Sequence, residues 1–444
     1  MTSDIKTDQI KRYQKNLDDD KVSSVIRRAV THQGILNTSS DFKSDSAMEP
    51  VFSIDLSTGK VADQKQSGRC WMFAALNTMR VRLMNGFKVE DDFELSQNYT
   101  NFWDKFEKSN YFLENVIRTA DQPLDSRKVS WLMTTPQQDG GQWDMLCALI
   151  EKYGIVPKSV MPETFSSSAS RELNKFLNLK LRHDAVILRE LVANKASDEE
   201  LSQTKDKMLN EIYKMLSYSL GEPVDHFDFE YRDKDKNYHI DRNLTPQDFF
   251  KKYVGINLDD YVSLINSPTD DKPYDKTYTI EMLGNVEGGR QVKHLNLEMD
   301  TLKDLAIKQL ESGETVWFGS DVGQSSNSKK GIMDTRLYAP DELFSTDLSL
   351  SKAERLDYGE SLMTHAMVIT GVDLVDGKPT KWKVENSWGE KPGHKGYFVM
   401  SDEWMDEFVY QFVINKKYLS EEQLKAQAQE PTVLNPWDPM GALA

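Results

Sequence analysis

The stretch Gln64-Lys-Gln-Ser-Gly-Arg-Cys70-Trp-Met-Phe-Ala-Ala-Leu-Asn77 predicts the element around which the rest of the chain is organised. A loop containing Gly68 leads into a helix whose first turn carries Cys70, with apolar residues on nearly every side. A helix that is apolar all round is buried. A helix N-terminus favours thiolate over thiol by roughly 0.3–1 kcal/mol, and by up to ~2 kcal/mol when partly buried. Because this is worth about one pKa unit, a reactive thiolate at neutral pH also needs a cationic partner from elsewhere in the chain.

The composition is typical of a globular protein, with 444 residues, 39% apolar and 28% charged. This length predicts two or three domains. The net charge of −16 argues against nucleic acid as a general partner, because duplex binding relies on Lys and Arg. The charge does not exclude a local basic channel. Two cysteines, Cys70 and Cys147, cannot form a Cys-rich zinc site or a disulfide framework. Since the sequence also has no apolar N-terminal segment and no long apolar run, we expect a cytoplasmic protein in a reducing environment.

The periodicity of apolar residues changes along the chain. Between about residues 165 and 275 they recur at steps of three and four, which predicts helices. Within that region Thr245 is an expected N-cap and Pro246 the first residue of a helix. Residues 278–283 and 292–297 then alternate as in a hairpin, and the last quarter of the chain is expected to form a mainly antiparallel sheet.

Three shorter segments complete this description. Residues 1–50 suggest one or two short helices and a loop. The run Pro136-Gln-Gln-Asp139-Gly140-Gly141-Gln-Trp143 is a turn before a helix that extends to about Tyr153. A later helix is expected to be capped by Asp300 or Thr301.

One histidine is well placed to be the partner of the thiol. His365 begins a predicted strand among small neighbours, and Asn386 ends the next one. Adjacent antiparallel strands can bring the two side by side, so that the Asn386 carbonyl accepts the imidazole N–H and leaves the other nitrogen for the thiol. The ring of Trp388 could shield that hydrogen bond from water, and thiol and imidazole would then form a thiolate–imidazolium pair. His183, His226 and His239 are explained more simply as surface or structural residues.

A further donor precedes the cysteine. Gln64 is close enough for its side-chain N–H to lie beside the backbone N–H of Cys70. Two donors there would hold the oxyanion that forms when sulfur attacks a carbonyl carbon. Taken singly, each residue has a simpler explanation: a buried apolar Cys, a core His, a turn at Asn386 and an ordinary loop amide. Their combination favours nucleophilic catalysis.

Together these motifs resemble those of papain-like cysteine peptidases. The matching segments are Gln64 with Ser67-Gly68-Arg69-Cys70-Trp71, Thr364-His365-Ala366 and Asn386-Ser387-Trp388-Gly389. The resemblance implies that Cys70 is the nucleophile, His365 the general base and then acid, Asn386 the residue that orients it, and Gln64 the oxyanion donor. It also implies that the backbone of Gly140 and Gly141 pairs with the substrate, and that neither a metal nor a cofactor takes part.

Two departures narrow the resemblance to one branch of that family. Ser67 stands where secreted members carry a disulfide cysteine, and the interval from Cys70 to His365 is about twice that of papain. The chain is similar in these respects to bleomycin hydrolase and the bacterial aminopeptidase C group. The supporting stretches include Phe102-Trp-Asp-Lys105, Val316-Trp-Phe-Gly319 and the C-terminal segment Pro436-Trp-Asp-Pro-Met-Gly-Ala-Leu-Ala444.

This resemblance implies an α+β, papain-like, two-lobed fold with a helical lobe, an antiparallel β lobe, a large helical insertion and an N-terminal extension. The expected division of the chain is an N-terminal extension with oligomer contacts (1–60), the helical lobe with the nucleophile (61–164), the inserted helical subdomain (165–275), the β lobe with His and Asn (276–430) and a C-terminal arm in the cleft (431–444). The resemblance further implies a homohexamer whose active sites face an internal chamber.

The expected function is a cytoplasmic cysteine aminopeptidase that removes N-terminal residues from peptides, with no membrane partner. A carboxylate at a fixed distance from the nucleophile would hold the substrate ammonium, and Ala444 at the end of the arm can supply it. An endopeptidase of the same fold, a nucleic-acid-binding or regulatory protein on a peptidase scaffold, and acyl transfer to an acceptor other than water remain alternatives.

Overall fold

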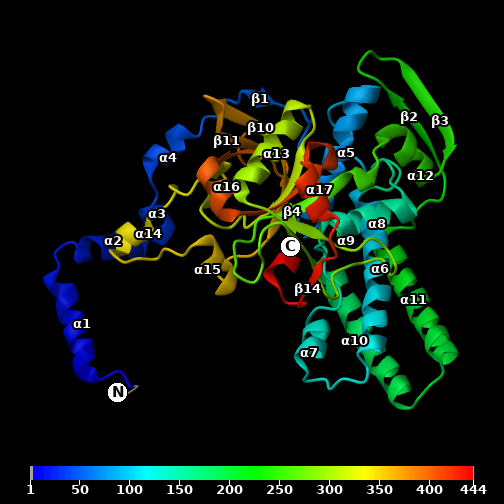
Figure 1. The fold of residues 1–444 in the computed structure, drawn as a ribbon, viewed down its shortest axis with the longest axis horizontal. Coiled ribbons are helices and arrows are strands. Elements are labelled where there is room, and N and C mark those ends of the chain that lie inside the picture. The colour runs from blue at the N-terminus through cyan, green and yellow to red at the C-terminus, as the bar shows by residue number, and fades with distance from the viewer. Residues whose placement is uncertain (1–3, 444) are drawn as a thin grey trace.

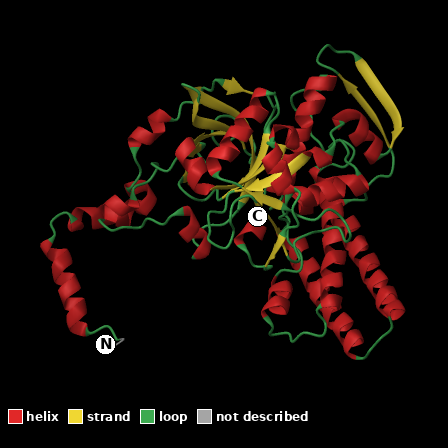
Figure 2. Ribbon diagram, viewed as in Figure 1, coloured by secondary structure: helices red, strands yellow, loops and turns green. Residues whose placement is uncertain are grey.

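A computed structural model describes residues 4–443. Its strands gather at the centre of the molecule with helices around them, and a separate two-stranded ribbon lies at one corner (Figures 1 and 2). Both helices and a large mixed sheet are present, which confirms the α+β class. Within residues 4–443, no helix combines the length and the apolar character needed to span a membrane.

The N-terminal segment projects from the rest of the chain (Figure 1). It contains four helices where one or two were expected: α1 (Thr7–Asp19), α2 (Ser23–Gln33), α3 (Ile35–Thr38) and α4 (Phe42–Ala47). No residue of α1 or α2 is buried. Short strand β1 (Ile54–Asp55) then joins this segment to the sheet through β10.

The helical lobe is built on the predicted buried helix. Its elements are α5 (Cys70–Phe87), α6 (Gln97–Arg118), α7 (Arg127–Thr134) and α8 (Trp143–Tyr153). Helix α5 begins at Cys70, and its apolar side chains share one core with α8 and one face of the sheet. The bounds of α8 agree with those expected from the turn at Gly140-Gly141.

A long helical hairpin dominates the inserted region and packs along α6 (Figure 1). The elements of this region are α9 (Phe165–Ser168), α10 (Arg171–Ala193), α11 (Asp198–Leu220), strands β2 (Phe227–Arg232) and β3 (Tyr238–Leu244), α12 (Pro246–Phe249), a π-helical turn (Phe250–Val254) and a 3-10 turn (Leu258–Asp260). Thr245 caps α12 as predicted, since its hydroxyl accepts the N–H of Asp248 at 3.0 Å.

The prediction of helices throughout residues 165–275 was wrong in two places. The ribbon of β2 and β3 was missed because Phe227, Phe229 and Tyr231 alternate with polar residues for a few positions, too short a run beside the long helical repeat. Phe229 packs on Phe249 at a ring-centroid distance of 5.1 Å, which fixes the ribbon to α12. In addition, β4 begins at Tyr261 and belongs to the central sheet.

The β lobe contains that central sheet. Its strands are β4 (Tyr261–Ile265), β5 (Lys276–Ile280), β6 (His294–Asn296), β7 (Val316–Ser320), β8 (Ser326–Asn327), β9 (Ile332–Met333), β10 (His365–Val375), β11 (Lys378–Glu385), β12 (Tyr397–Ser401), β13 (Val409–Asn415) and β14 (Thr432–Leu434). They run in the order β14-β5-β6-β4-β13-β7-β10-β11-β12-β9-β8, with β1 beside β10. Most neighbours are antiparallel, as predicted; β14–β5, β4–β6 and β12–β9 are parallel pairs.

Helices cover the second face of the sheet. They and the remaining short elements are α13 (Met299–Glu311), α14 (Pro340–Phe344), α15 (Lys352–Asp357), α16 (Asp402–Phe408), a 3-10 turn (Lys416–Tyr418), α17 (Glu421–Gln427) and a 3-10 turn (Pro439–Gly441). The N-cap of α13 is Glu298, so the expected cap at Asp300 or Thr301 was wrong by two or three residues. The predicted hairpin forms between β5 and β6, with shorter strands than expected.

Two contacts position the site between the lobes. Helix α5 packs against β10, and β10 lies between β7 and β11 in the sheet. His365 is the first residue of β10, and Asn386 directly follows the last residue of β11. The first turn of the buried helix therefore meets the beginning of one strand and the end of the next.

Candidate active site

Cys70 lies at the first position of α5, where the backbone N–H groups of a helix have no partner within it. Its side chain is 1% exposed. The sulfur accepts a hydrogen bond from the backbone N–H of Ala366 at 3.4 Å. Because Ala366 follows His365 in β10, this bond brings the sulfur of Cys70 to the backbone beside His365.

The imidazole of His365 is held by two neighbours. Its Nε2 lies 2.8 Å from Oδ1 of Asn386, and the indole of Trp388 lies tilted against the ring at 4.8 Å between centroids. The backbone N–H of Ser387 donates to the same Oδ1 at 2.7 Å. With Nε2 engaged, Nδ1 is the ring nitrogen left to exchange a proton with a thiol.

Burial acts on the protonation of both groups. It raises the pKa of the Cys70 thiol to about 11, against the hydrogen bonds from backbone N–H groups that lower it. It lowers the pKa of His365 to about 4, although the hydrogen bond to Asn386 raises it. Burial thus favours the neutral thiol and the neutral imidazole, and the thiolate–imidazolium pair stays a prediction.

Gln64 lies in the loop before α5 and makes hydrogen bonds in two directions. Its Nε2 donates to the carbonyl oxygen of Ser67 at 2.6 Å, and its Oε1 accepts the hydroxyl of Ser387 at 2.5 Å. The backbone N–H of Gln64 also donates to the carbonyl of Ser387 at 2.8 Å. These bonds tie the loop to the residue after Asn386. Since an amide nitrogen carries two hydrogens, one remains for a partner outside the loop.

Gly140 and Gly141 form one wall of the cleft, directly before α8. A Cβ on Gly141 would lie 2.7 Å from the Trp71 ring, so no larger residue fits there without a shift. The Trp71 indole N–H donates to the carbonyl of Asp139 at 2.7 Å, and the Lys108 ammonium donates to the carbonyl of Gly140. The glycine pair is therefore fixed against the first turn of α5.

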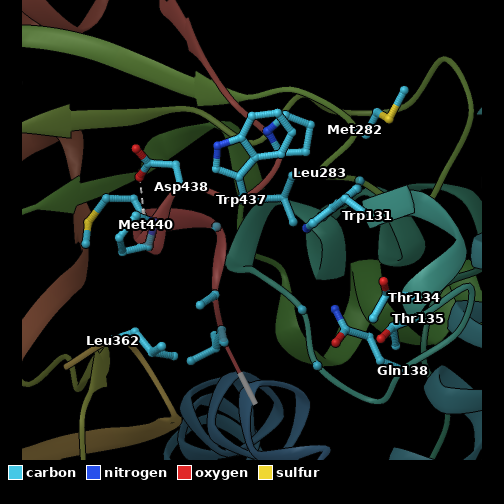
Figure 3. Close-up of a pocket in the computed structure, with 18 of the residues that line it drawn as sticks. Trp131, Thr134, Thr135, Gln138, Met282, Leu283, Leu362, Trp437, Asp438 and Met440 are labelled. Atoms are coloured by element: carbon cyan, nitrogen blue, oxygen red, sulfur yellow. Dashed lines mark hydrogen bonds between the residues drawn. The ribbon is translucent and has the colours of Figure 1, made fainter. Parts of the chain in front are cut away.

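A cleft of about 820 Å³ is lined by Gly140 and Gly141 on one side and by the C-terminal arm, residues 436–443, on another. Figure 3 shows the arm passing between Leu362 on one side and the loop of Thr134, Thr135 and Gln138 on the other. Its last described residue, Leu443, is 6% exposed and belongs to the same apolar cluster as Cys70. Ala444, expected to hold the substrate ammonium, lies outside the described residues.

Three contacts fix the course of the arm. Strand β14 pairs in parallel with β5, the Arg127 guanidinium lies 3.9 Å from the centre of the Trp437 ring, and the Lys272 ammonium lies 3.1 Å from the Asp438 carboxylate. Asp438 also accepts the N–H of Met440 at 2.9 Å, the bond drawn in Figure 3. The arm is thus anchored to both lobes, and two of its anchored residues, Trp437 and Asp438, themselves line the cleft.

The other sequence candidates lie away from this arrangement. Within residues 4–443 no group of three or more His, Cys, Asp and Glu side chains is placed to hold a metal ion. His183 and His239 neighbour carboxylates of the inserted region, Asp184 and Asp233 respectively. Both belong to that region rather than to the cleft.

Sequence reasoning missed several residues that shape the site. Ser387 was treated as part of a turn, yet its hydroxyl and carbonyl both bond Gln64. Asp139 was noted as part of a turn signal, although its carboxylate bonds residues of three other segments. No local pattern reveals such partners, since they are far apart in the sequence.

Comparison with known proteins places this geometry among relatives. The model of the peptidase C1-like family matches residues 4–441. Aminopeptidase C of Lactobacillus helveticus is 58% identical over 447 residues, which cover 100% of this chain and 99% of the relative. Aminopeptidase C of Listeria monocytogenes is 52% identical, with 100% of both chains covered. The crystal structure of PepW from Lactobacillus rhamnosis HN001 is similar with a TM-score of 0.99 and 67% identity over 100% of both chains.

Proposed function

The chain belongs to the peptidase C1-like family, in the branch of bleomycin hydrolase and aminopeptidase C, and we propose that it acts as a cysteine aminopeptidase with Cys70 as the nucleophile. The single observation that carries the proposal is the junction of α5 and β10. There the Ala366 N–H bonds the sulfur of Cys70, while the imidazole of His365 is held by Asn386. A thiol, a base and an orienting amide in this order support attack on a peptide carbonyl.

The proposed reaction has two stages. The neutral imidazole of His365 takes the thiol proton as the sulfur of Cys70 bonds to the carbonyl carbon of the first peptide bond. The resulting oxyanion accepts hydrogen bonds from the backbone N–H of Cys70 and the remaining amide hydrogen of Gln64. The C–N bond then breaks and the leaving amine takes the proton from His365. A water molecule next gives its proton to the same imidazole as its oxygen bonds to the thioester carbon. The C–S bond breaks, the carboxylic acid leaves, and the sulfur of Cys70 takes the proton back from His365.

We assign the removal of single N-terminal residues to the arm. Its anchors at Arg127 and Lys272 support a fixed depth of the chain end in the cleft. The carboxylate of Ala444 pairs with the substrate ammonium in this proposal, and the arm itself blocks longer chains from extending past it. Gly140 and Gly141 hold the substrate backbone on the opposite wall.

A homohexamer is part of the same proposal, as is the division of the chain at residues 60, 164 and 430. The boundary expected at 275 lies earlier, before β4, which belongs to the central sheet. Helices α1 and α2 have no buried residue, and the N-terminal segment exposes large apolar side chains, namely Ile10, Leu17, Val25, Leu36 and Phe42. An apolar surface of this kind supports contact with other copies. In a sizing experiment we expect six times the mass of one chain; a monomer at working concentration contradicts the chamber.

The expected location of the enzyme is the cytoplasm. Both thiols are free, and neither Cys70 nor Cys147 has a disulfide partner among residues 4–443. A nucleophilic thiol that must stay reduced is compatible with a reducing compartment. Localisation of the tagged full-length chain by cell fractionation tests this expectation.

The function is tested with one peptide in two forms, with a free and with an acetylated N-terminus, whose products are identified by mass. The native protein should shorten the free form one residue at a time and leave the acetylated form intact. Deletion of the last four residues should admit cleavage inside the acetylated form. Ala444→Gly keeps the terminal carboxylate and should behave as the native protein.

Two outcomes contradict this assignment. Internal cleavage of both peptide forms by the native protein would identify an endopeptidase of the same fold. An unchanged product pattern after deletion of the arm would mean that the carboxylate of Ala444 does not select the N-terminus.

A further inference from the structure

A buried carboxylate joins three segments around the cleft. Each oxygen of Asp139 accepts two hydrogen bonds: Oδ1 from the Lys105 ammonium at 2.7 Å and the Asn174 amide at 2.8 Å, Oδ2 from the backbone N–H of Gly68 at 2.8 Å and the hydroxyl of Ser170. Gly68 belongs to the loop before the nucleophile, Lys105 to α6, and the other two to the start of the inserted helical hairpin.

Asp139 is also connected through its own backbone. Its carbonyl accepts the Trp71 indole N–H at 2.7 Å, and the next two residues along the chain are Gly140 and Gly141. The side chain thus reaches the loop on one side of Cys70, while the main chain contacts the residue on the other side. Both halves of the proposed site, the nucleophile and the proposed substrate-binding segment of Gly140-Gly141, are held by this one residue.

The surroundings of Asp139 stabilise the ionised form of its carboxyl group. Burial raises the pKa of this carboxyl group, but the Lys105 ammonium and the hydrogen bonds from Ser170 and Asn174 outweigh it and hold the pKa well below its usual range. Lys105 is itself 0% exposed and Asp139 8% exposed. A buried carboxylate with four donors and a paired ammonium has a fixed position, because movement would leave charged groups without partners.

The inserted region also bonds the nucleophile loop directly. The backbone N–H of Gln66 donates to the carbonyl of Ser168 at 2.9 Å, and the N–H of Ser170 donates to the carbonyl of Gln66 at 3.3 Å. These bonds and the carboxylate of Asp139 hold the loop at two successive points, Gln66 and Gly68. The loop carries Gln64 at one end and Cys70 at the other.

We propose that Asp139 is a positioning residue for the peptidase reaction, whose carboxylate fixes the loop of Gly68 against the Gly140-Gly141 segment so that the oxyanion donors and the substrate backbone stay in register. This inference rests on the proposed function. It gives the inserted hairpin a role in catalysis, since Ser170 and Asn174 supply two of the four donors. Asp139 touches no reacting atom and acts through the loop.

Asp139→Asn is the informative substitution. Each carboxylate oxygen accepts two donors, so whichever way the asparagine amide turns, its NH₂ group faces two donors. We expect kcat for peptide hydrolysis to fall about 10²-fold, the effect of a misplaced oxyanion donor. The rate of Cys70 alkylation by iodoacetamide, which forms no oxyanion, should not fall, because the Asp139 carboxylate raises the pKa of the thiol and its neutralisation favours the thiolate.

Two controls separate positioning from general damage. Asp184→Asn alters another buried carboxylate of the insertion, which pairs with Lys180 at 2.7 Å and bonds neither Gly68 nor Gly140-Gly141; its kcat should match that of the native protein. The double variant Asp139→Asn/Lys105→Met removes the ammonium that the single variant leaves unpaired, and should restore folding but not kcat.

A third variant covers the case in which both Asp139 variants fail to fold. Ser170→Ala removes one donor and should lower kcat about three- to tenfold, the worth of one hydrogen bond, with alkylation unchanged. The inference is overturned if folded Asp139→Asn or Ser170→Ala keeps the native kcat. It is also overturned if kcat and the alkylation rate fall together in either variant, or if Asp184→Asn loses as much activity as Asp139→Asn.

The proposed function fails separately from this inference. If the native protein cleaves no peptide at a free N-terminus, the aminopeptidase assignment is wrong. The ratio of kcat to alkylation rate can then still be measured on a blocked peptide that Cys70 cleaves, and it supports or overturns the role of Asp139 by the same criteria.

Discussion

The two cysteines of this chain are both buried, but they occupy different positions in their helices. Cys70 is the first residue of α5, whereas Cys147 lies inside α8. Burial raises the pKa of both thiols. A nearby carboxylate adds to the rise at both, Asp139 at Cys70 and Asp144 at Cys147, but only at Cys70 do backbone N–H groups, those of Ala366, Trp71 and Cys70 itself, oppose it.

The difference shows that burial alone does not make a cysteine inert or reactive. A thiol in the middle of a helix has neighbours whose N–H groups are bonded within the helix. A thiol at a helix N-terminus faces free donors, and here it faces a strand that carries an imidazole. Position along the helix therefore distinguishes a nucleophile from a packing residue, and three experiments test this comparison.

The largest effect is expected when each thiol is removed in turn. Cys70→Ala should abolish peptide hydrolysis, because no acyl-enzyme can form, with the fold and assembly intact. Cys147→Ala should keep kcat and lower the free energy of unfolding by about 1–2 kcal/mol, since it leaves a small cavity in the core. Steady-state hydrolysis measures kcat of the two variants, and thermal unfolding measures their stability. Activity in Cys70→Ala would refute the assignment of the nucleophile.

The next effect concerns the loop that precedes Cys70 and carries Gln64, which has no counterpart at Cys147. Gln64→Ala removes the second oxyanion donor and should lower kcat by roughly 10²–10³-fold while the sulfur is still alkylated. Gln66→Ala, in the same loop but with an exposed side chain, is the matched control and should change kcat little. Equal losses in the two variants would show that Gln64 supports the loop rather than the oxyanion.

The smallest effect is a shift in pH dependence. The base must be neutral to take the thiol proton, and burial lowers the pKa of His365 to about 4. Its neutral form therefore persists until the pH falls through about 4, below the ordinary histidine value of about 6.5. The acid limb of kcat/KM should lie there, and Asn386→Ala, which removes a hydrogen bond that raises this pKa, should move it lower still.

That pH profile also bears on the two thiols. An acid limb near pH 6.5 would mean that His365 is well solvated when substrate binds, and would contradict the effect of burial. Alkylation of the native protein over the same pH range, with peptide mapping, should label Cys70 and leave Cys147 unmodified.

Local patterns were sufficient wherever a structure depends on neighbours in the sequence. The apolar run after Cys70 predicted a buried helix, the turn at Gly140-Gly141 predicted the start of α8, and Thr245 was identified as a cap. The beginning of β10 at His365 followed from the same reasoning. Each depends on periodicity, capping or turn chemistry within a few residues.

Contacts between distant segments could not be obtained in this way. The ribbon of β2 and β3 is held by Phe249, and nothing in its own short alternation outweighs the helical repeat around it. The course of the arm depends on Arg127 and Lys272, which come from two different lobes. Resemblance to a family supplied the arm as an expectation, without its anchors.

The sequence by itself determined which chemical groups this protein has for catalysis: one thiol at a helix N-terminus, one histidine at a strand start, and amides to hold them. The tertiary structure decided how those groups are charged and held, because desolvation and hydrogen bonding depend on what surrounds a side chain. Asp139 illustrates the division, since in the sequence it is one residue of a turn, and in the fold four donors from three segments meet at its carboxylate.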